Sequence, residues 1–170
     1  MMSTSVIGLD NGLCGAFVVL RVGSYGPELC EPAIRWTYTR RAQWERNRPL
    51  LRDRIRYSIR RWHPLVLACE EPKSIMGFKH VGISQARFAE WARQIAEDEG
   101  IEYLEVPGQS GEQPGRAFAI LRQSLSEFST REEMADMSGP AGEHARDAMA
   151  VGISALSRLP KVGALSRESR

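Results

Sequence analysis

Short apolar runs punctuated by turn residues predict at least five β-strands. The runs cover residues 5–10, 15–22, 28–38, 65–70 and 101–106. Asn11-Gly12 separates the first two runs and is a strong hairpin signal. With the third run close behind, the beginning of the chain predicts an antiparallel meander. The fourth run is nearly all apolar until Glu70, which is typical of a central strand that is covered on both faces.

Helical periodicity and capping signals predict four helices between and after these strands. They cover residues 49–62, 84–99, 115–127 and 141–158. In the first helix, Asn47 is a possible cap, Pro49 an early helical position, and apolar residues recur every three or four positions. Residues 73–82 and 107–115 are predicted loops, and residues 131–136 a polar connection. The pattern favours one mixed α/β sheet with helices on both faces, in a single domain over 1–158, followed by a flexible tail over 159–170.

Composition is that of a soluble globular domain. The chain has 170 residues, of which 42% are hydrophobic and 26% charged. No apolar run approaches the roughly 20 residues of a membrane span, and no charged, apolar leader begins the sequence. Three widely spaced cysteines without a C-x-x-C pair favour reduced thiols. We therefore expect a protein of the cytoplasm or a nucleoid-containing compartment, neither secreted nor bound to a membrane.

Positive charge is concentrated in one segment, although the net charge is only +2. Residues 40–61 contain nine arginines and two acidic residues. Such a segment is either a solvated helix face or a surface for a polyanionic partner. Arg52, Arg56 and Arg60 are the candidate phosphate contacts on the second interpretation.

Acidic residues end two of the predicted strands, at Asp10 and Glu70. His144 and Asp147 lie three positions apart near the start of the last helix and therefore share a face. A simpler interpretation of this pair is a first-turn acid favoured by the helix dipole beside a half-buried histidine. Clustered carboxylates, however, repel one another, and a hard cation such as Mg²⁺ removes that cost. Two such ions about 3.5–4 Å apart can support phosphodiester hydrolysis.

Three motifs resemble those of the RuvC-like Holliday junction resolvases, which belong to the RNase H-like nuclease superfamily. They are Gly8-Leu9-Asp10-Asn11-Gly12-x-x-Gly15-Ala16, Ala68-Cys69-Glu70-Glu71-Pro72 and His144-Ala145-Arg146-Asp147-Ala148. Their order and approximate spacing match the family over roughly residues 5–158. The first motif alone also resembles actin-like ATPases, but the chain is short and has no second clear Asp-x-Gly loop.

The resemblance implies which residues form the site. Asp10 matches the ligand shared by both metal ions, Glu70 the acid after the fourth strand, and Asp147 the acid of the last helix. His144 stands where family members have Asp or, in some cases, His. Glu71 is the alternative to Glu70, less favoured because alternation along a strand turns it to the other face. The implied cofactor is Mg²⁺, with two ions per site, and Mn²⁺ as a substitute.

The family resemblance also implies a five-stranded mixed sheet and a homodimer that acts on branched, four-way junction DNA. Met76 and Phe78 match a region where family members insert a wedge at the junction centre, although ordinary loop packing explains them equally well. Lys73 and Lys79 in the same segment are candidate DNA contacts. We therefore expect a metal-dependent, structure-selective DNA endonuclease that makes paired symmetric cuts. The alternatives are another RNase H-like nuclease, such as an RNase H or an exonuclease, and an inactive junction-binding module.

Overall fold

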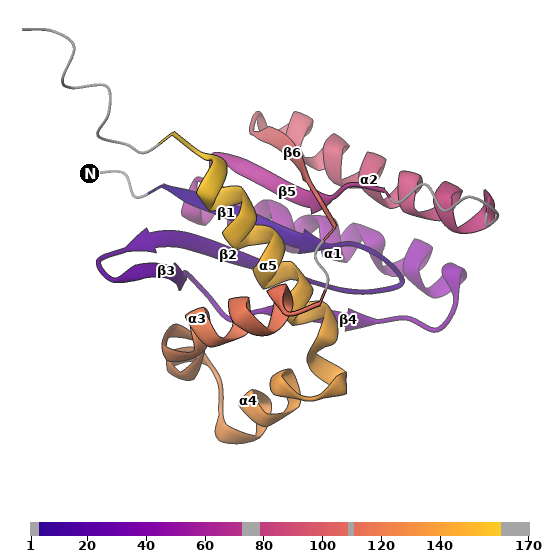
Figure 1. Ribbon diagram of the computed structural model, residues 1–170. Helices are drawn as coiled ribbons and strands as arrows, with labels where there is room; N and C mark the ends of the chain where they lie inside the picture. The colour runs from indigo at the N-terminus through magenta and orange to yellow at the C-terminus, as the bar shows by residue number, and fades with distance from the viewer. Residues whose placement is uncertain (1–3, 73–78, 109–110, 161–170) are drawn as a thin grey trace, which may run out of the picture.

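The computed structural model describes residues 4–72, 79–108 and 111–160, without the side chains of residues 79–85. Its strands are β1 (Ser5–Asp10), β2 (Cys14–Gly23), β3 (Gly26–Leu29), β4 (Ile34–Thr37), β5 (Val66–Glu70) and β6 (Glu102–Val106). Its helices are α1 (Arg41–Trp62), α2 (Lys79–Glu99), α3 (Gln113–Phe128), α4 (Arg131–Ser138), the short 3₁₀ helix η1 (Pro140–Gly142) and α5 (Glu143–Arg158). One sheet lies between α1 and α2 on one face and α3 and α5 on the other (Figure 1).

The sheet is mixed, as the sequence predicts. Its strand order is β3-β2-β1-β5-β6, and β4 pairs with β2 beside β3. The β1–β2, β2–β3 and β2–β4 pairs are antiparallel, whereas β1–β5 and β5–β6 are parallel. The expected single strand over 28–38 is wrong in detail, because it is divided into β3 and β4. Pro32 lies in the gap, and a proline cannot donate a hydrogen bond to a strand ladder.

Alternation along the central strands fills two separate cores. Val6 of β1 packs against α3 and α5, while its neighbour Ile7 packs against α1 and α2. On the second face, Ile55 of α1 and Ile95 of α2 are fully buried. A sheet buried on both faces fixes the register of its strands, because a slip of one residue would exchange the two faces. The ends of β1 and β5 are therefore held rigidly.

The first helix is longer than predicted. It begins at Arg41, so Pro49 lies inside it and Asn47 is not its cap. The Gln43 side-chain oxygen accepts hydrogen bonds from the backbone N–H groups of Thr39 and Arg40, which satisfies donors at the helix start. Burial of Trp44 anchors the first turns. Packing therefore overrides the missing hydrogen bond that Pro49 costs.

Two other boundaries also differ from expectation. Helix α2 begins at Lys79, so the predicted loop over 73–82 is wrong for its last four residues. Helix propensities of most residues differ by less than about 1 kcal/mol, so they do not force the helix to begin at Ser84. The predicted polar connection at 131–136 is the helix α4, where the Thr130 hydroxyl and the Glu133 carboxylate form a reciprocal capping box. No helix in the described ranges combines the length and apolar character needed to cross a bilayer.

Candidate metal centre

Asp10 and Glu70 end neighbouring parallel strands. Leu9 of β1 pairs with Cys69 of β5, so Asp10 and Glu70 are the next positions in register. Leu9 and Cys69 both face α1 and α2. Because side chains alternate, Asp10 and Glu70 turn to the opposite face, where α5 lies. The two carboxylates predicted from the sequence are therefore adjacent and on the same side of the sheet.

Helix α5 lies directly on β1 because the strand has glycine where the two elements cross. A Cβ atom built on Gly8 would lie 2.5 Å from the Gly152 nitrogen and 2.7 Å from its Cα, and closer still to the Ala148 carbonyl oxygen. No larger residue fits at Gly8 without separating helix and strand. This crossing brings the first turns of α5 over the end of β1. His144 and Asp147, one helical turn apart, are consequently held at Asp10.

Asp10, His144 and Asp147 form a cluster with the donor set of a metal site. One potential ligand atom from each residue lies within 4.8 Å of those of the other two. His144 Nδ1 and Asp10 Oδ2 are 2.6 Å apart and share a hydrogen bond. All three residues are partly buried. Two carboxylates and an imidazole suit a divalent cation such as Mg²⁺ or Mn²⁺.

Electrostatics in this cluster favour an added positive charge. Burial, reinforced by the negative charges of Asp10 and Glu70, raises the pKa of Asp147 to about 6. The hydrogen bond to Asp10 raises the pKa of His144, while burial opposes that shift. A protonated His144 is thus an internal counterion for the carboxylates. A divalent cation would neutralise the negative charge of the carboxylates further. The residues present therefore fit the metal that the family resemblance implies.

Glu70 and Glu71 both border the cluster. Together with Asp10 and Phe88 they line a small pocket of about 110 Å³. Glu70 is near enough for its charge to raise the pKa of Asp147, but it is not one of the three clustered residues. The Glu71 side chain is exposed, and its backbone N–H bonds to the Val106 carbonyl at 2.8 Å. Strand register supports Glu70 as the further ligand, and that assignment stays a prediction.

The three arginines suggested as phosphate contacts are held in ion pairs. Arg52 pairs with Asp98, and Arg56 pairs with Glu99. Arg60 also pairs with Glu99, at 3.0 Å. Their role in DNA binding stays a prediction, although a phosphate would have to compete with these carboxylates. Among the other candidate contacts, Lys73, Met76 and Phe78 lie outside the described residues, as does the side chain of Lys79.

Two residues that support the site were not identified from the sequence. The Asn11 amide donates to the Phe88 carbonyl at 2.5 Å, which ties the turn after Asp10 to α2. Arg146 donates to the carbonyls of Met137 and Gly139, at 2.5 and 2.6 Å, and so fixes the chain that leads into α5. Both residues lie within the motifs, which was the available signal. The Asn11 contact joins residues 77 positions apart, and the Arg146 contacts depend on how the chain turns between α4 and α5, so neither could be derived from the sequence.

Comparison with solved structures shows that the fold is similar to that of RuvC. No protein-family model matches the sequence, and no curated protein sequence matches it either. Thermus thermophilus RuvC, solved in complex with a Holliday junction substrate, matches at a TM-score of 0.58 and 15% identity, over 89% of this chain and 91% of that one. A second T. thermophilus RuvC structure matches at 0.56 and 18%, over 89% and 92% of the two chains.

A third match comes from a virus. The fowlpox virus resolvase, solved with Holliday junction DNA, matches at a TM-score of 0.53 and 12% identity, over 91% of this chain and 97% of that one. These likenesses confirm the predicted fold, a mixed sheet flanked by helices. At such low identity they establish the fold alone, so the function has to be argued from the site.

Proposed function

We propose that the protein is a metal-dependent endonuclease that resolves four-way DNA junctions. The observation that carries this proposal is the convergence of Asp10, His144 and Asp147 at the end of a buried strand, in a chain with the RuvC-type fold. The neighbours whose structures include Holliday junction DNA support branched DNA as the substrate class. The basic segment of α1 supports a polyanionic substrate as well.

Asp10, Asp147, Glu70 and His144 would hold the metal ions, with Asp10 shared between two of them. Mg²⁺ is the expected ion, with Mn²⁺ as a substitute. Divalent cations at such a site lower the pKa of bound water and neutralise charge that develops on a phosphodiester. His144 can hold or release a proton at Nδ1, against Asp10. The ends of β1 and β5 would hold the carboxylates of Asp10 and Glu70 in place around the metal ions.

A homodimer is part of the proposal. Two symmetric cuts across a junction need two active sites that are related by a two-fold axis, and a closed dimer supplies them. The test is sedimentation of the purified protein, alone and with junction DNA.

Incubation of an end-labelled synthetic four-way junction with protein and Mg²⁺ tests the activity. Duplex, flap and RNA–DNA hybrid substrates are run beside it. We expect paired cuts in the junction, none without a divalent metal, and far less cleavage of the other substrates. Asp10→Asn should abolish cleavage while junction binding is kept or improved, because it removes negative charge that faces phosphates.

Asp136→Asn is the matched control, because Asp136 is an exposed acid of α4 that lies outside the cluster. It should cleave like the unaltered protein. Cleavage by Asp10→Asn at the full rate would contradict the assignment of the site. Preference for hybrids or ends would point to an RNase H or an exonuclease, and tight junction binding without cleavage in any metal would point to an inactive binding module.

A further inference from the structure

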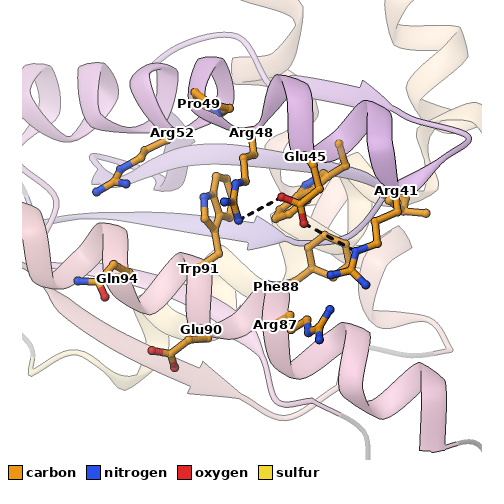
Figure 2. Close-up of a pocket in the computed structure, with 12 residues that line it drawn as sticks. Arg41, Glu45, Arg48, Pro49, Arg52, Arg87, Phe88, Glu90, Trp91 and Gln94 are labelled. Atoms are coloured by element: carbon orange, nitrogen blue, oxygen red, sulfur yellow. Dashed lines mark ion pairs between the residues drawn. The ribbon is translucent and has the colours of Figure 1, made fainter.

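A groove of about 730 Å³ lies between α1 and α2, separate from the carboxylate pocket (Figure 2). Arginines and aromatic residues make up most of its lining: Arg41, Trp44, Arg48, Arg52, Arg87, Phe88 and Trp91. In Figure 2, Arg48 and Arg52 extend from α1 toward α2, and Trp91 and Phe88 rise from α2 toward α1. Along α1 the lining runs from Arg41 to Arg52, which is about 16 Å of helix.

The groove has an aromatic floor that is only partly covered. Trp44 makes edge-to-face contacts with Phe88 and Trp91, at ring-centroid distances of 4.7 and 5.6 Å. Phe88 and Trp91 are half-buried and so leave aromatic surface in the groove. Trp44 is only 4% exposed, yet its indole N–H has no hydrogen-bond partner among the described residues. The described residues thus leave unpaired an indole N–H of a kind that, when buried, ordinarily finds an acceptor.

The charge of the groove favours an anionic occupant. Arg41 and Arg48 both face Glu45, at 3.7 and 3.4 Å, so one carboxylate serves two guanidinium groups. Arg87 has no ion-pair partner in the described part of the chain. Glu90, the other acid of the lining, pairs with Arg93 outside the groove at 3.0 Å. Positive charge is therefore in excess, beside aromatic surface.

The groove adjoins the pocket of the candidate metal centre. Phe88 lines both the groove and the pocket that contains Asp10. The Asn11 amide bonds to the Phe88 carbonyl, and Leu13 of the same turn also lines the groove. A chain molecule that lies along the groove would therefore pass beside the pocket that Asp10 and Glu70 line.

We propose that this groove binds a single-stranded segment of the DNA substrate and leads it to the metal centre. Guanidinium groups alternating with aromatic faces are the features that bind unpaired nucleotides: arginines contact phosphates, and bases stack on the rings. Stacking requires unpaired bases, since the bases of a duplex are already stacked on one another. This inference rests on the proposed nuclease function and adds unpaired nucleotides next to the cleavage site to its substrate.

Binding of a fluorescein-labelled oligo-dT of about 12 nucleotides, followed by anisotropy in EDTA, tests the groove without any cleavage. Trp91→Leu should raise the dissociation constant about fivefold or more, the loss of one stacked base. Arg87→Gln should reduce the slope of log K against log salt by about 0.7, the loss of one phosphate contact on a single strand. Glu45→Gln should bind more tightly, because it frees two arginines.

Arg54→Gln is the matched control. Arg54 is an exposed arginine on the same helix that stacks on Tyr57 outside the groove, so its removal should leave both the affinity and the salt slope unchanged. Thermal melts verify that each variant folds. If Trp91→Leu does not fold, the exposed Arg87→Gln decides the test by its salt slope.

Groove variants that bind oligo-dT as the Arg54→Gln control does would overturn the proposal. So would sedimentation in which Trp91→Leu separates a dimer into monomers with unchanged affinity for oligo-dT, because the groove would then be a contact between copies of the chain. Junction cleavage measured in parallel keeps the two proposals apart. If the protein cleaves junctions but the groove variants bind oligo-dT normally, only the proposal for the groove is refuted. If the groove variants bind oligo-dT weakly but the protein does not cleave junctions, only the proposed nuclease function is refuted.

Discussion

A single methyl group added to Gly8 should disable the metal centre without altering any of its side chains. The new Cβ would lie 2.5 and 2.7 Å from the Gly152 nitrogen and Cα, and nearer still to the Ala148 carbonyl oxygen. Ordinary contacts between such atoms are about 3.5 Å or more. All of the opposing atoms are backbone, so no side-chain rotation relieves the overlap. Helix α5 must then move away from β1 by about 1 Å, which is the difference between an ordinary contact and the 2.5 Å to the Gly152 nitrogen.

The expected cost has two parts. Overpacking of this kind costs about 1–3 kcal/mol of unfolding free energy. The same shift carries His144 and Asp147 away from Asp10, and a misplacement of about 1 Å can reduce a catalysed rate by about 10²-fold. The loss of activity should therefore exceed what the loss of folded protein explains.

Gly152→Ala is the matched control, because it adds the same methyl group on the other side of the crossing. Its Cβ would meet Leu20 side-chain atoms at 2.7 and 3.3 Å and the Gly8 Cα at an ordinary 3.6 Å. A leucine side chain can rotate, and alanine favours a helix over glycine by about 1 kcal/mol. We expect a change in stability near zero.

Urea unfolding gives the free energies, and single-turnover junction cleavage in Mg²⁺ gives the rates. A Gly8→Ala protein equal to the unaltered one in both measurements would contradict this expectation. Equal effects of the two alanine substitutions would contradict it as well.

Two further predictions concern charge in the cluster. Asp147→Asn should stabilise the metal-free protein at neutral pH, because burial raises the folded-state pKa of Asp147 from 3.8 to about 6. The stability that Asp147 contributes is greatest below about pH 4 and falls as the pH rises to 6. In EDTA, the free energy of unfolding of the variant should therefore exceed that of the unaltered protein by about 1 kcal/mol at pH 7.5, after allowance for solvent screening, and by little at pH 4. A difference that does not depend on pH would contradict this. For His144, the hydrogen bond to Asp10 raises the pKa above its ordinary 6.5, so the stability it contributes is present below pH 6.5 and lost above the raised value. His144→Ala should therefore destabilise the metal-free protein more at pH 5.5 than at pH 9, and it should cleave poorly in Mg²⁺. His144→Asp should keep substantial activity with a changed Mn²⁺ to Mg²⁺ preference. A His144→Ala enzyme equal to the unaltered one in every measurement would show that His144 has no part in the site.

The cluster could be predicted because its signals are local. An acid directly after an apolar run marks the end of a buried strand, and three-residue spacing places His144 and Asp147 on one helix face. Two strands that run parallel then bring Asp10 and Glu70 together. The sequence also contained the signal for α4, since Thr130 and Glu133 have capping-box spacing, but the polar composition of that segment obscured it.

The groove between α1 and α2 could not be predicted in the same way. Periodicity places Phe88 and Trp91 on the apolar side of their helix, which favours the interior. It does not tell how closely two helices approach, and here a gap leaves both rings half-exposed. The ion pairs of Arg52, Arg56 and Arg60 with the end of α2 likewise join residues about 40 positions apart. Such contacts follow from the tertiary arrangement alone.

The division of β3 from β4 at Pro32 bears on how copies of the chain can aggregate. Each of these edge strands has only four residues, too few to serve as a long template for a strand of another molecule. The opposite edge, β6, carries the exposed carboxylate of Glu102, which opposes pairing with a second β6, while Glu105 of the same strand is paired with Arg93 of α2. Neither side of the sheet therefore invites strand addition, and the surfaces left for a specific encounter between two copies are helical.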